Sequence, residues 1–385
     1  MYYYKRFFKI MIEIDIAVGS GLKVTCDRDQ LVAKLATVSR VVSSRGSVQV
    51  LSGVLLRPDG DTLELAATDM ELSLRTTLVA QIEGDSAVVV PGKLLVDLAR
   101  LLPAAEVTIE YRPEEGVAHI SSGSYSSKLN VFAAEDFPRL PAVDPAPHTV
   151  ATASLLETVD RVARSASKDE SRPVLTGIQV RFEGKRLFMA ATDSYRLSFK
   201  ETELEQAGPD LEAIIPARAL TELARIASGT ETVMLGVNEN TVVFGTGDTW
   251  LTTRRIDGQF PDVSRLLPES FEIEVDLPRA ELRDVVRRAA VMALRNAPLR
   301  LRFAEGELTI SAQSQDVGET HESLPAAYTG EPLEIGFNAE FLADGVDSVR
   351  GDTVRLKLIN PLRPGLITSA DDSFWYLIMP IRLAG

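Results

Sequence analysis

The sequence predicts an α+β protein built from three copies of one structural unit. The segment AATDMELSLRTT at residues 66–77 returns as AATDSYRLSFKET at residues 190–202. Both copies stand in the same order of expected elements: strand, turn, strand, Ala-Thr-Asp, strand, a strand that ends in proline, and an amphipathic helix. A fainter third copy starts near residue 299. Because internal repeats reflect repeated structural units, they indicate the architecture before any single motif does.

The strands are predicted from alternating apolar and polar residues on either side of short turns. Leu63 alternates with Leu65 in the first copy, and Leu187 with Met189 in the second. Asp-Gly or Glu-Gly pairs precede them, which is typical of hairpin turns. In the third copy, Ser-Ala-Gln at residues 311–313 replaces Ala-Ala-Thr.

Each unit is expected to carry two helices and roughly eight strands. The clearest helical stripe consists of Leu94, Leu95, Leu98, Leu101 and Leu102, which recur at close to 3.6-residue spacing behind a proline. The predicted helices cover residues 27–45, 91–102, 154–172, 216–227, 278–295 and 338–350.

The chain is expected to divide into three domains at 22–144, 145–270 and 271–385. The Pro-rich stretch LPAVDPAPHT separates the first two. Residues 1–21 are interpreted as an extension outside the fold, because charged residues interrupt the apolar block that a secretory signal needs.

The composition is that of an ordinary soluble globular protein, with 45% apolar and 25% charged residues. No apolar run is long enough to span a membrane. The single cysteine, Cys26, excludes an internal disulfide and a thiolate metal site, and is typical of a reducing cytoplasm.

No catalytic motif is found. The three histidines share no helical face, and the chain has neither a phosphate-binding loop nor a nucleophile elbow. Asp69 and Asp193 stand where aspartate commonly hydrogen-bonds the backbone of a turn. We therefore expect no catalytic residue, no metal and no cofactor. The alternative is a metal-dependent enzyme acting on phosphate esters or nucleic acid through these two residues and Asp371.

The charge distribution points to a polyanionic partner despite the acidic total. The six predicted helices carry a net charge of +5, and the whole chain carries −14, so the remainder carries −19. Basic residues that recur in register are Arg279, Arg283 and Arg287 on one helix, and the matching pairs Lys93 with Arg218 and Arg100 with Arg225. An arginine row can be merely a solvated face, but repetition between units favours contacts with phosphates. Aromatic residues do not interleave with these cations, so stacking on single strands is not expected.

The motifs VFAAEDFPRLP, AATDSYRLS, FPDVSRLLP and SFWYLIMPIRL together resemble the bacterial sliding clamp family, the β subunit of the replicative DNA polymerase III holoenzyme. The resemblance runs from about Leu22 to Leu383. It implies the DNA-clamp fold, in which two copies join head to tail into a homodimeric ring. Helices then line the central hole and antiparallel sheets form the outer wall. Such a ring encircles double-stranded DNA without sequence preference, and it implies no enzyme activity.

The resemblance also implies a groove between the second and third domains for short peptides of the polymerase α subunit, the clamp loader and other clamp-motif proteins. Its residues would be Leu175, Thr192, Ser194, Tyr195, Arg196, Leu197, Pro261, Arg265, Leu266, Leu377, Met379, Pro380, Ile381, Arg382 and Leu383. Apolar side chains would form the groove, and Arg196 and Arg382 would hold polar groups of the peptide. Many members have Gly-His where this chain has Ser194-Tyr195, and residues 384–385 extend past the usual end. YLIMPIRL could alternatively be only a last core strand.

Two further surfaces follow from the resemblance. The residues implied to face DNA are Arg45, Lys93, Arg100, Lys168, Arg218, Arg225, Arg279, Arg283 and Arg287. The dimer interface would include Leu129, Val291 and Met292. The expected location is the cytoplasm, on the nucleoid during replication, with no membrane partner. The remaining alternative is a monomeric peptide-binding scaffold that does not encircle DNA.

Overall fold

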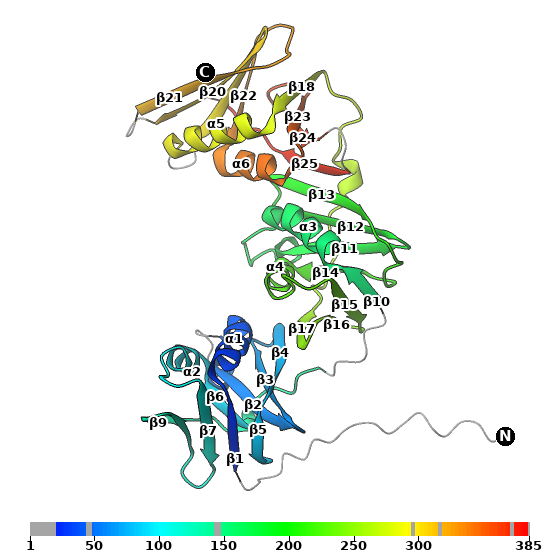
Figure 1. Ribbon diagram of the computed structural model, residues 1–385. Coiled ribbons are helices and arrows are strands. Elements are labelled where there is room, and N and C mark those ends of the chain that lie inside the picture. Colours follow the sequence, from blue (N-terminus) through cyan, green and yellow to red (C-terminus); the bar gives the residue numbers. More distant parts are fainter. Residues whose placement is uncertain are drawn as a thin grey trace, which may run out of the picture. The chain divides into compact units, whose positions relative to one another are not determined.

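The protein is represented by a computed structural model that describes residues 21–43, 48–141, 148–293, 297–314, 318–369 and 373–383. The chain forms two compact units (Figure 1). Unit 1 contains residues 1–143 and 247–252, and unit 2 contains residues 144–246 and 253–385. None of the helices in the described ranges is long and apolar enough to cross a membrane.

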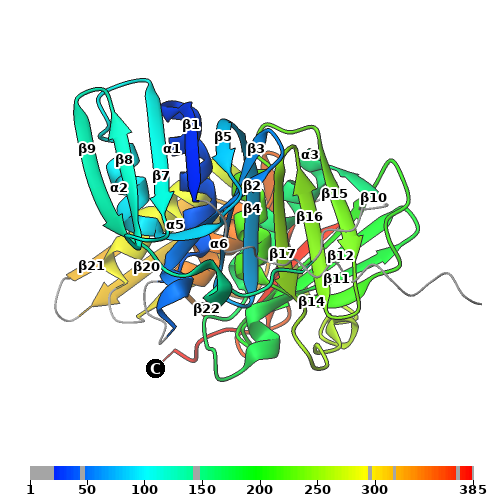
Figure 2. The same cartoon turned by 90° about the horizontal axis from the view of Figure 1, so that it is seen from below.

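Unit 1 contains two antiparallel sheets and two helices. Its elements are β1 (Leu22–Asp27), α1 (Arg28–Val38), β2 (Gly53–Asp59), β3 (Thr62–Thr68), β4 (Leu72–Val79), β5 (Gln81–Gly84), β6 (Val88–Pro91), α2 (Gly92–Ala99), β7 (Glu106–Arg112), β8 (Val117–Ser122) and β9 (Tyr125–Asn130). One sheet has the order β5-β1-β7-β8-β9, and Figure 2 shows β7, β8 and β9 side by side. The other contains β4-β3-β2-β6. Residues 249–252 of β17 (Thr249–Arg254) belong to this unit and lie next to β4.

Unit 2 contains the second and third repeats. Its helices are α3 (Thr152–Val162), α4 (Ala217–Ile226), α5 (Arg279–Met292) and α6 (Ala339–Ser348). Its strands are β10 (His148–Ala151), β11 (Gly177–Glu183), β12 (Arg186–Thr192), β13 (Arg196–Glu203), β14 (Glu212–Pro216), β15 (Thr232–Val237), β16 (Thr241–Thr246), β18 (Ile273–Pro278), β19 (Pro298–Ala304), β20 (Glu307–Ser314), β21 (Gly318–Pro325), β22 (Leu333–Asn338), β23 (Thr353–Leu358), β24 (Gly365–Thr368) and β25 (Phe374–Ile378).

One sheet of unit 2 joins two repeats. Its order is β14-β11-β12-β13-β25-β24-β23-β18. A separate four-stranded sheet has the order β21-β20-β19-β22. The pairing of β13 with β25 sets Leu197 opposite Leu377 and Phe199 opposite Trp375. This pairing brings the middle of the chain next to its end.

The threefold repeat is confirmed. Strands β2, β3, β4 and β6 pair as β11, β12, β13 and β14 do, and β19, β20, β21 and β22 repeat the pattern. Helix α2, α4 or α6 follows the last strand of each set, and the described residues contain two helices per repeat. The α+β fold class predicted from the sequence is therefore correct.

The Ala-Thr-Asp motif is a turn, here called the first Asp turn (residues 68–72) and the second Asp turn (residues 192–196). The Asp69 carboxylate accepts from the backbone N–H groups of residues 71 and 72 at 3.1 and 2.8 Å. The Asp193 carboxylate accepts from those of residues 195 and 196 at 2.9 and 3.0 Å. Met70 and Ser194 occupy the same place in both turns with positive φ, 80° and 81°. The structural role predicted for both aspartates is confirmed.

Two predicted helices are too long. Helix α1 ends at Val38 and continues only as a short 3₁₀ turn to Val41, and α3 ends at Val162 rather than residue 172. After α3, the Asp169 carboxylate accepts from the backbone N–H of Ser171 at 3.0 Å, which forms a local turn. The proline at position 173 also disfavours helical geometry in the residue before it.

Two details of the helix predictions are also corrected. Leu94 and Leu101 are exposed, so the buried stripe of α2 is narrower than the five-leucine pattern predicts. Within their observed bounds, the six helices carry ten basic and ten acidic residues, so their charges cancel instead of summing to +5. The surplus of basic residues lies just past the C-terminal ends of the helices, as at Arg40, Arg100 and Arg164. There it complements the negative end of the helix dipole.

Candidate functional site

Apart from Leu175, the predicted groove residues come from three segments that meet in unit 2. The second Asp turn leads into β13, and the C-terminal segment (residues 379–383) follows β25, which pairs with β13. The backbone N–H of Met379 donates to the carbonyl oxygen of Tyr195 at 2.8 Å. The sheet register therefore places the C-terminal segment directly beside the second Asp turn.

The third segment is the loop at residues 261–267. Leu197 and Leu377 are buried in one apolar cluster, against which Val263, Leu267 and Trp375 pack while partly exposed. Through these contacts the loop lies against both β13 and β25. The three segments thus lie next to one another, and the apolar cluster joins the loop to the two strands that carry the other segments.

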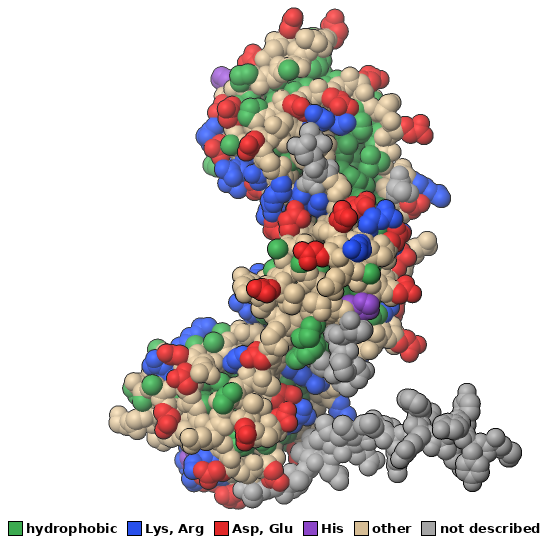
Figure 3. Space-filling model, turned by 45° about the vertical axis from the view of Figure 1, so that its right-hand side comes forward, with side chains coloured by type: hydrophobic (Ala, Val, Ile, Leu, Met, Phe, Trp, Pro, Cys, Tyr) green, Lys and Arg blue, Asp and Glu red, His purple; other side chains and the backbone are tan. Residues whose placement is uncertain are grey.

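These three segments keep large apolar side chains in solvent. Tyr195 is 62% exposed, Leu266 48% and Met379 44%, one from each segment. Figure 3 shows hydrophobic side chains gathered on one face of the C-terminal part of unit 2. Exposed apolar residues grouped in this way are typical of binding sites for apolar ligands or peptides.

The polar residues of the second Asp turn are mostly occupied within the chain. The Thr192 hydroxyl is buried and donates to the carbonyl oxygen of Arg196 at 2.6 Å. The Ser194 hydroxyl accepts from the Arg172 guanidinium at 3.0 Å, which ties the turn to the segment after α3. These groups shape the turn, and they leave mainly apolar side chains to meet a ligand.

Arg196 does not lie as predicted. Its side chain is only 5% exposed, its Nε donates to Asp193 at 3.0 Å, and its Nη1 donates to Asp344 on α6 at 2.6 Å. The guanidinium also stacks over the ring of Phe341 at 4.2 Å. Arg196 therefore joins the second Asp turn to α6, instead of offering its charge to a peptide.

Electrostatics keep this arginine charged. Burial works to lower the pKa of Arg196, but the Tyr376 phenol and the Asp344 carboxylate outweigh it, so the pKa is raised. Burial raises the pKa of Tyr376, whose hydroxyl donates to the backbone carbonyl of Phe341 at 2.7 Å. Asp344 and Tyr376 were not predicted from the sequence, because no local pattern links Arg196 to residues 148 or more positions away.

The C-terminal segment is fixed by a backbone contact. The N–H of Ile381 donates to the carbonyl oxygen of Gly336 on β22 at 2.8 Å. A side chain at position 336 would come within 2.6 Å of Leu383, so only glycine allows this approach. Arg382 remains exposed, whereas residues 384–385 lie outside the described part of the chain.

The remaining groove residues differ in exposure. Leu175 lies in a 3₁₀ turn at residues 173–176 and is partly exposed. Pro261 is exposed and Pro380 partly so. The Arg265 side chain is 84% exposed and pairs with Asp262 at 2.9 Å. Arg265 and Arg382 are thus the groove cations that reach solvent.

The residues predicted to face DNA lie either on α5 or elsewhere in the chain, and those outside α5 are exposed wherever the structure describes them. Lys93, Arg100, Lys168, Arg218 and Arg225 are exposed. Arg45 lies outside the described residues.

The arginine row of α5 is partly committed to α6. Arg279 donates to the carbonyl oxygens of residues 346 and 347, at 3.4 and 3.2 Å, and so caps the end of α6. Burial lowers the pKa of Arg279. Arg287 pairs with Asp347 at 2.9 Å while it remains exposed, and the Arg283 side chain is 35% exposed. Arg283 also pairs with Asp284 at 3.5 Å, so all three arginines of the row have partners within the chain, and Arg287 is the most exposed of them.

The residues predicted for the dimer interface lie near sheet edges. Leu129 is buried on β9, an edge strand of unit 1, and Val291 is 71% exposed at the end of α5. Met292 is partly buried against the core of the third repeat. Helix α5 is linked to the edge strand β21 by Arg288, which pairs with Glu322 at 2.5 Å.

No group of three or more His, Cys, Asp or Glu side chains in the described ranges could hold a metal ion. Asp69 and Asp193 are engaged in their turns, and Asp371 lies outside the described residues.

Comparison with known proteins agrees with the repeat pattern. The family descriptions that match are the N-terminal domain of the DNA polymerase III beta subunit at residues 22–141, its central domain at 149–262 and its C-terminal domain at 264–382. The chain is 35% identical to the beta sliding clamp of Synechococcus elongatus over 382 residues, with 94% of this chain and 100% of that protein covered. It is 32% identical over 379 residues to the beta sliding clamp of Streptomyces coelicolor, with the same coverage.

Solved structures show the same fold. The sliding clamp of Bacillus subtilis matches with a TM-score of 0.88 and 27% identity, covering 95% of this chain and 100% of that one. The beta sliding clamp of C. crescentus matches with a TM-score of 0.89 and 29% identity, covering 94% of this chain and 99% of that one. A Pseudomonas aeruginosa clamp bound to griselimycin matches with a TM-score of 0.86 and 28% identity, covering 94% and 100%.

The three repeats of antiparallel sheet and paired helices, with exposed apolar residues at the junction of two repeats, define a DNA-clamp protein. The family and sequence matches identify the family: the chain belongs to the DNA polymerase III beta subunit family, the bacterial beta sliding clamps. The resemblance stated from the sequence is confirmed, and the function of the chain is that of a sliding clamp.

Proposed function

We propose that this clamp is a non-catalytic processivity factor that holds the replicative polymerase on DNA through the groove of unit 2. The observation that carries the proposal is that the second Asp turn, the loop 261–267 and the C-terminal segment adjoin, and each exposes a large apolar side chain. A partner peptide would insert apolar side chains beside exposed Tyr195, Leu266 and Met379. The polymerase α subunit, the clamp loader and other clamp-motif proteins are the proposed partners.

The proposed groove keeps all fifteen predicted residues, with one changed role. Arg382 and Arg265 reach solvent and can meet polar or acidic groups of a peptide. Arg196 is a positioning residue, because its contacts with Asp193 and Asp344 hold the turn in place from behind. The methionine and leucine side chains can adapt to peptides of different sequence.

The proposed assembly is a head-to-tail ring of two copies, each with domains at 22–144, 145–270 and 271–385 after an extension at 1–21. Leu129 on the edge strand β9 of one copy would meet Val291 and Met292 of the other. Joining edge strands removes unpaired backbone groups that otherwise favour aggregation. The exposed cations would contact phosphates, and the contacts would be weak enough to permit sliding. The proposed location is the cytoplasm, on the nucleoid during replication.

Griselimycin binding tests the groove. Because a relative's structure contains this ligand, we propose that labelled griselimycin binds this chain in the groove, as measured by fluorescence polarisation. Met379→Ala should weaken binding by roughly tenfold, since it removes an exposed apolar side chain of the groove.

The matched control is Met70→Ala, which removes the 50% exposed methionine of the first Asp turn. It should leave the affinity unchanged. Equal effects of both substitutions, or no binding by the unaltered chain, would contradict the proposed groove.

A further inference from the structure

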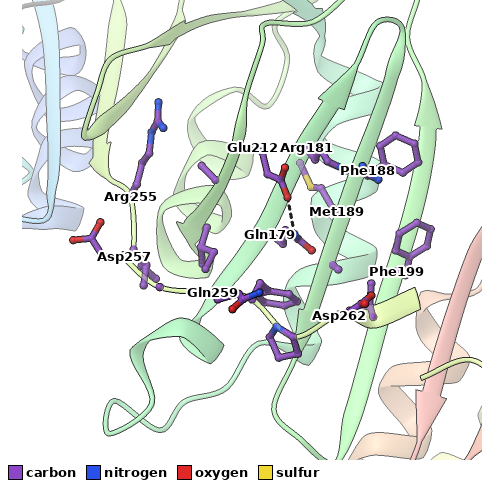
Figure 4. Close-up of a pocket in the computed structure, with 18 of the residues that line it drawn as sticks. Gln179, Arg181, Phe188, Met189, Phe199, Glu212, Arg255, Asp257, Gln259 and Asp262 are labelled. Carbon is purple, nitrogen blue, oxygen red and sulfur yellow. Dashed lines mark hydrogen bonds between the residues drawn. The ribbon is translucent and has the colours of Figure 1, made fainter. Parts of the chain in front are cut away.

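A hollow of about 940 Å³, next to the proposed groove, lies on the same sheet. Strands β11 to β14 form one wall, the loop at residues 255–263 forms the other, and β25 contributes a tryptophan. In Figure 4, Glu212 and Gln179 lie in the middle, with Phe188 and Phe199 to one side and Arg255 and Asp257 to the other.

Aromatic rings line one end of the hollow. Phe199 stacks on Trp375 with ring centroids 4.8 Å apart, and Phe188 lies 6.2 Å from Phe199. Phe199 and Trp375 are partly exposed, so their rings are accessible from the hollow. Such faces favour aromatic or cationic side chains as contacts.

The charged side chains that line the hollow are acidic in sum: Glu212, Glu239, Asp257 and Asp262 stand against Arg181 and Arg255. Arg181 pairs with Glu183, and Arg255 keeps its charge while its Nη2 donates to the neutral carbonyl oxygen of Asn238 at 2.6 Å. In contrast, among the described residues, Asp257 forms no ion pair. The same holds for Glu239, and Glu212 contacts only the Gln179 amide, at 3.3 Å. Three carboxylates are therefore available to a basic ligand.

The first repeat shows that the fold does not require this opening. The bridge between Val89 and Phe132 there matches the one between Ile214 and Ile256 in the second repeat. Yet the equivalent face of unit 1 is filled, and a cavity of only about 130 Å³ remains.

Charged side chains close that face of unit 1. Arg57 pairs with Glu64 at 2.9 Å, and Arg75 donates to the carbonyl oxygen of Pro141 at 2.7 Å. In the second repeat, phenylalanines 188 and 199 stand in the strand positions of Glu64 and Arg75. The open aromatic hollow of the second repeat is therefore not shared by the first repeat.

The hollow is continuous with the proposed groove. Pro261 and Trp375 line the hollow, Val263 borders both, and the Phe199–Trp375 pair lies two residues along the strands from Leu197–Leu377. Two residues of a strand correspond to about 7 Å. One peptide can therefore cross from the groove into the hollow.

We propose that the hollow is a second subsite for partner peptides, which takes the segment flanking the groove-binding motif and prefers an aromatic residue next to lysine or arginine. This inference rests on the proposed groove function. The ring would contact Phe199 and Trp375, and the cation would meet Glu212, Asp257 or Glu239. A partner that filled both sites would bind more tightly than one that filled the groove alone, because the second contact is intramolecular.

Tryptophan fluorescence provides a local test, because the chain has only two tryptophans. In the full-length Trp250→Phe variant, Trp375 reports from the hollow itself. The probes are the blocked peptides GFKFKG and GFEFEG, titrated in the presence of saturating griselimycin. We expect GFKFKG to change the emission with a Kd at least tenfold lower than that of GFEFEG.

Substitutions then assign the charge preference. Glu212→Gln combined with Asp257→Asn should weaken GFKFKG at least fivefold, whereas Glu64→Gln in unit 1 should have no effect. Equal affinity for the two peptides, or equal response of the two variants, would overturn the proposal. So would peptide binding that appears only after deletion of residues 1–20, since the aromatic and basic N-terminus would then be the occupant. Failure of griselimycin itself to bind would instead contradict the groove.

Discussion

Replacing Arg196 by leucine tests whether this residue positions the groove or binds the peptide directly. Leucine is a matched choice, because Leu72 occupies the same place in the first Asp turn and is buried there. The substitution removes a buried cation that pairs with Asp193 and Asp344. Breaking a buried ion pair costs about 3–5 kcal/mol. Asp193 keeps its backbone donors and Asp344 lies 3.4 Å from Arg164, so we expect a loss of about 2–3 kcal/mol.

The assay is urea unfolding of the Trp250→Phe protein followed through Trp375, together with griselimycin polarisation under folded conditions. Asp344→Asn should destabilise less, and the two substitutions combined should cost less than their sum, because they remove the same interaction. Griselimycin affinity should change by less than about threefold, since the guanidinium does not reach solvent. A tenfold loss of affinity with unchanged stability would show that Arg196 contacts the ligand and would refute this reasoning.

Three further predictions concern local geometry. Ser194→Gly should stabilise unit 2 by about 1 kcal/mol in urea unfolding, and Met70→Gly should do the same for unit 1, because both residues have a φ near +80° that glycine adopts without strain; a loss in either case would contradict this. Gly336→Ala should displace the C-terminal segment and weaken griselimycin binding while the fold remains, since the new methyl group would lie 2.6–2.8 Å from that segment; unchanged affinity would argue against it. Hydrogen bonds, chiefly from Arg112, lower the pKa of Glu115 to about 2, so NMR titration should show this carboxylate charged well below pH 4.5. Its contribution to stability should be present above its unfolded pKa and be lost as pH falls toward 2; a midpoint near 4.5 would contradict the contact.

Local chemistry was predictable from the sequence. The turn role of Asp69 and Asp193 follows from the short reach of an aspartate side chain to the next backbone N–H groups. The repeat order and the two helices per unit follow from periodic patterns that extend over whole elements. Even so, the predicted ends of α1 and α3 were wrong, because α3 ends at Val162 and the residues after it form a 3₁₀ turn and then a local turn at Asp169.

Contacts between distant residues were not predictable. Arg196 matches a groove motif, yet its partner Asp344 lies on another repeat, so its burial becomes evident only from the fold. The α5 arginines form a regular row in the sequence, but Arg279 turns back onto the end of α6. The aromatic hollow likewise depends on the β13–β25 pairing, which brings Trp375 onto Phe199. Spacing along the chain carries no information about such pairings.

Retention on DNA circles tests the central claim, that this clamp holds DNA by encircling it. The protein would be loaded onto nicked circular DNA by a matching clamp loader, washed in moderately high salt, and followed before and after the circle is linearised. Salt weakens phosphate contacts but does not open a closed ring. The account predicts retention on circles and escape from the ends of linear DNA. Equal loss from both forms would mean that the protein binds only through charge, and would contradict the ring.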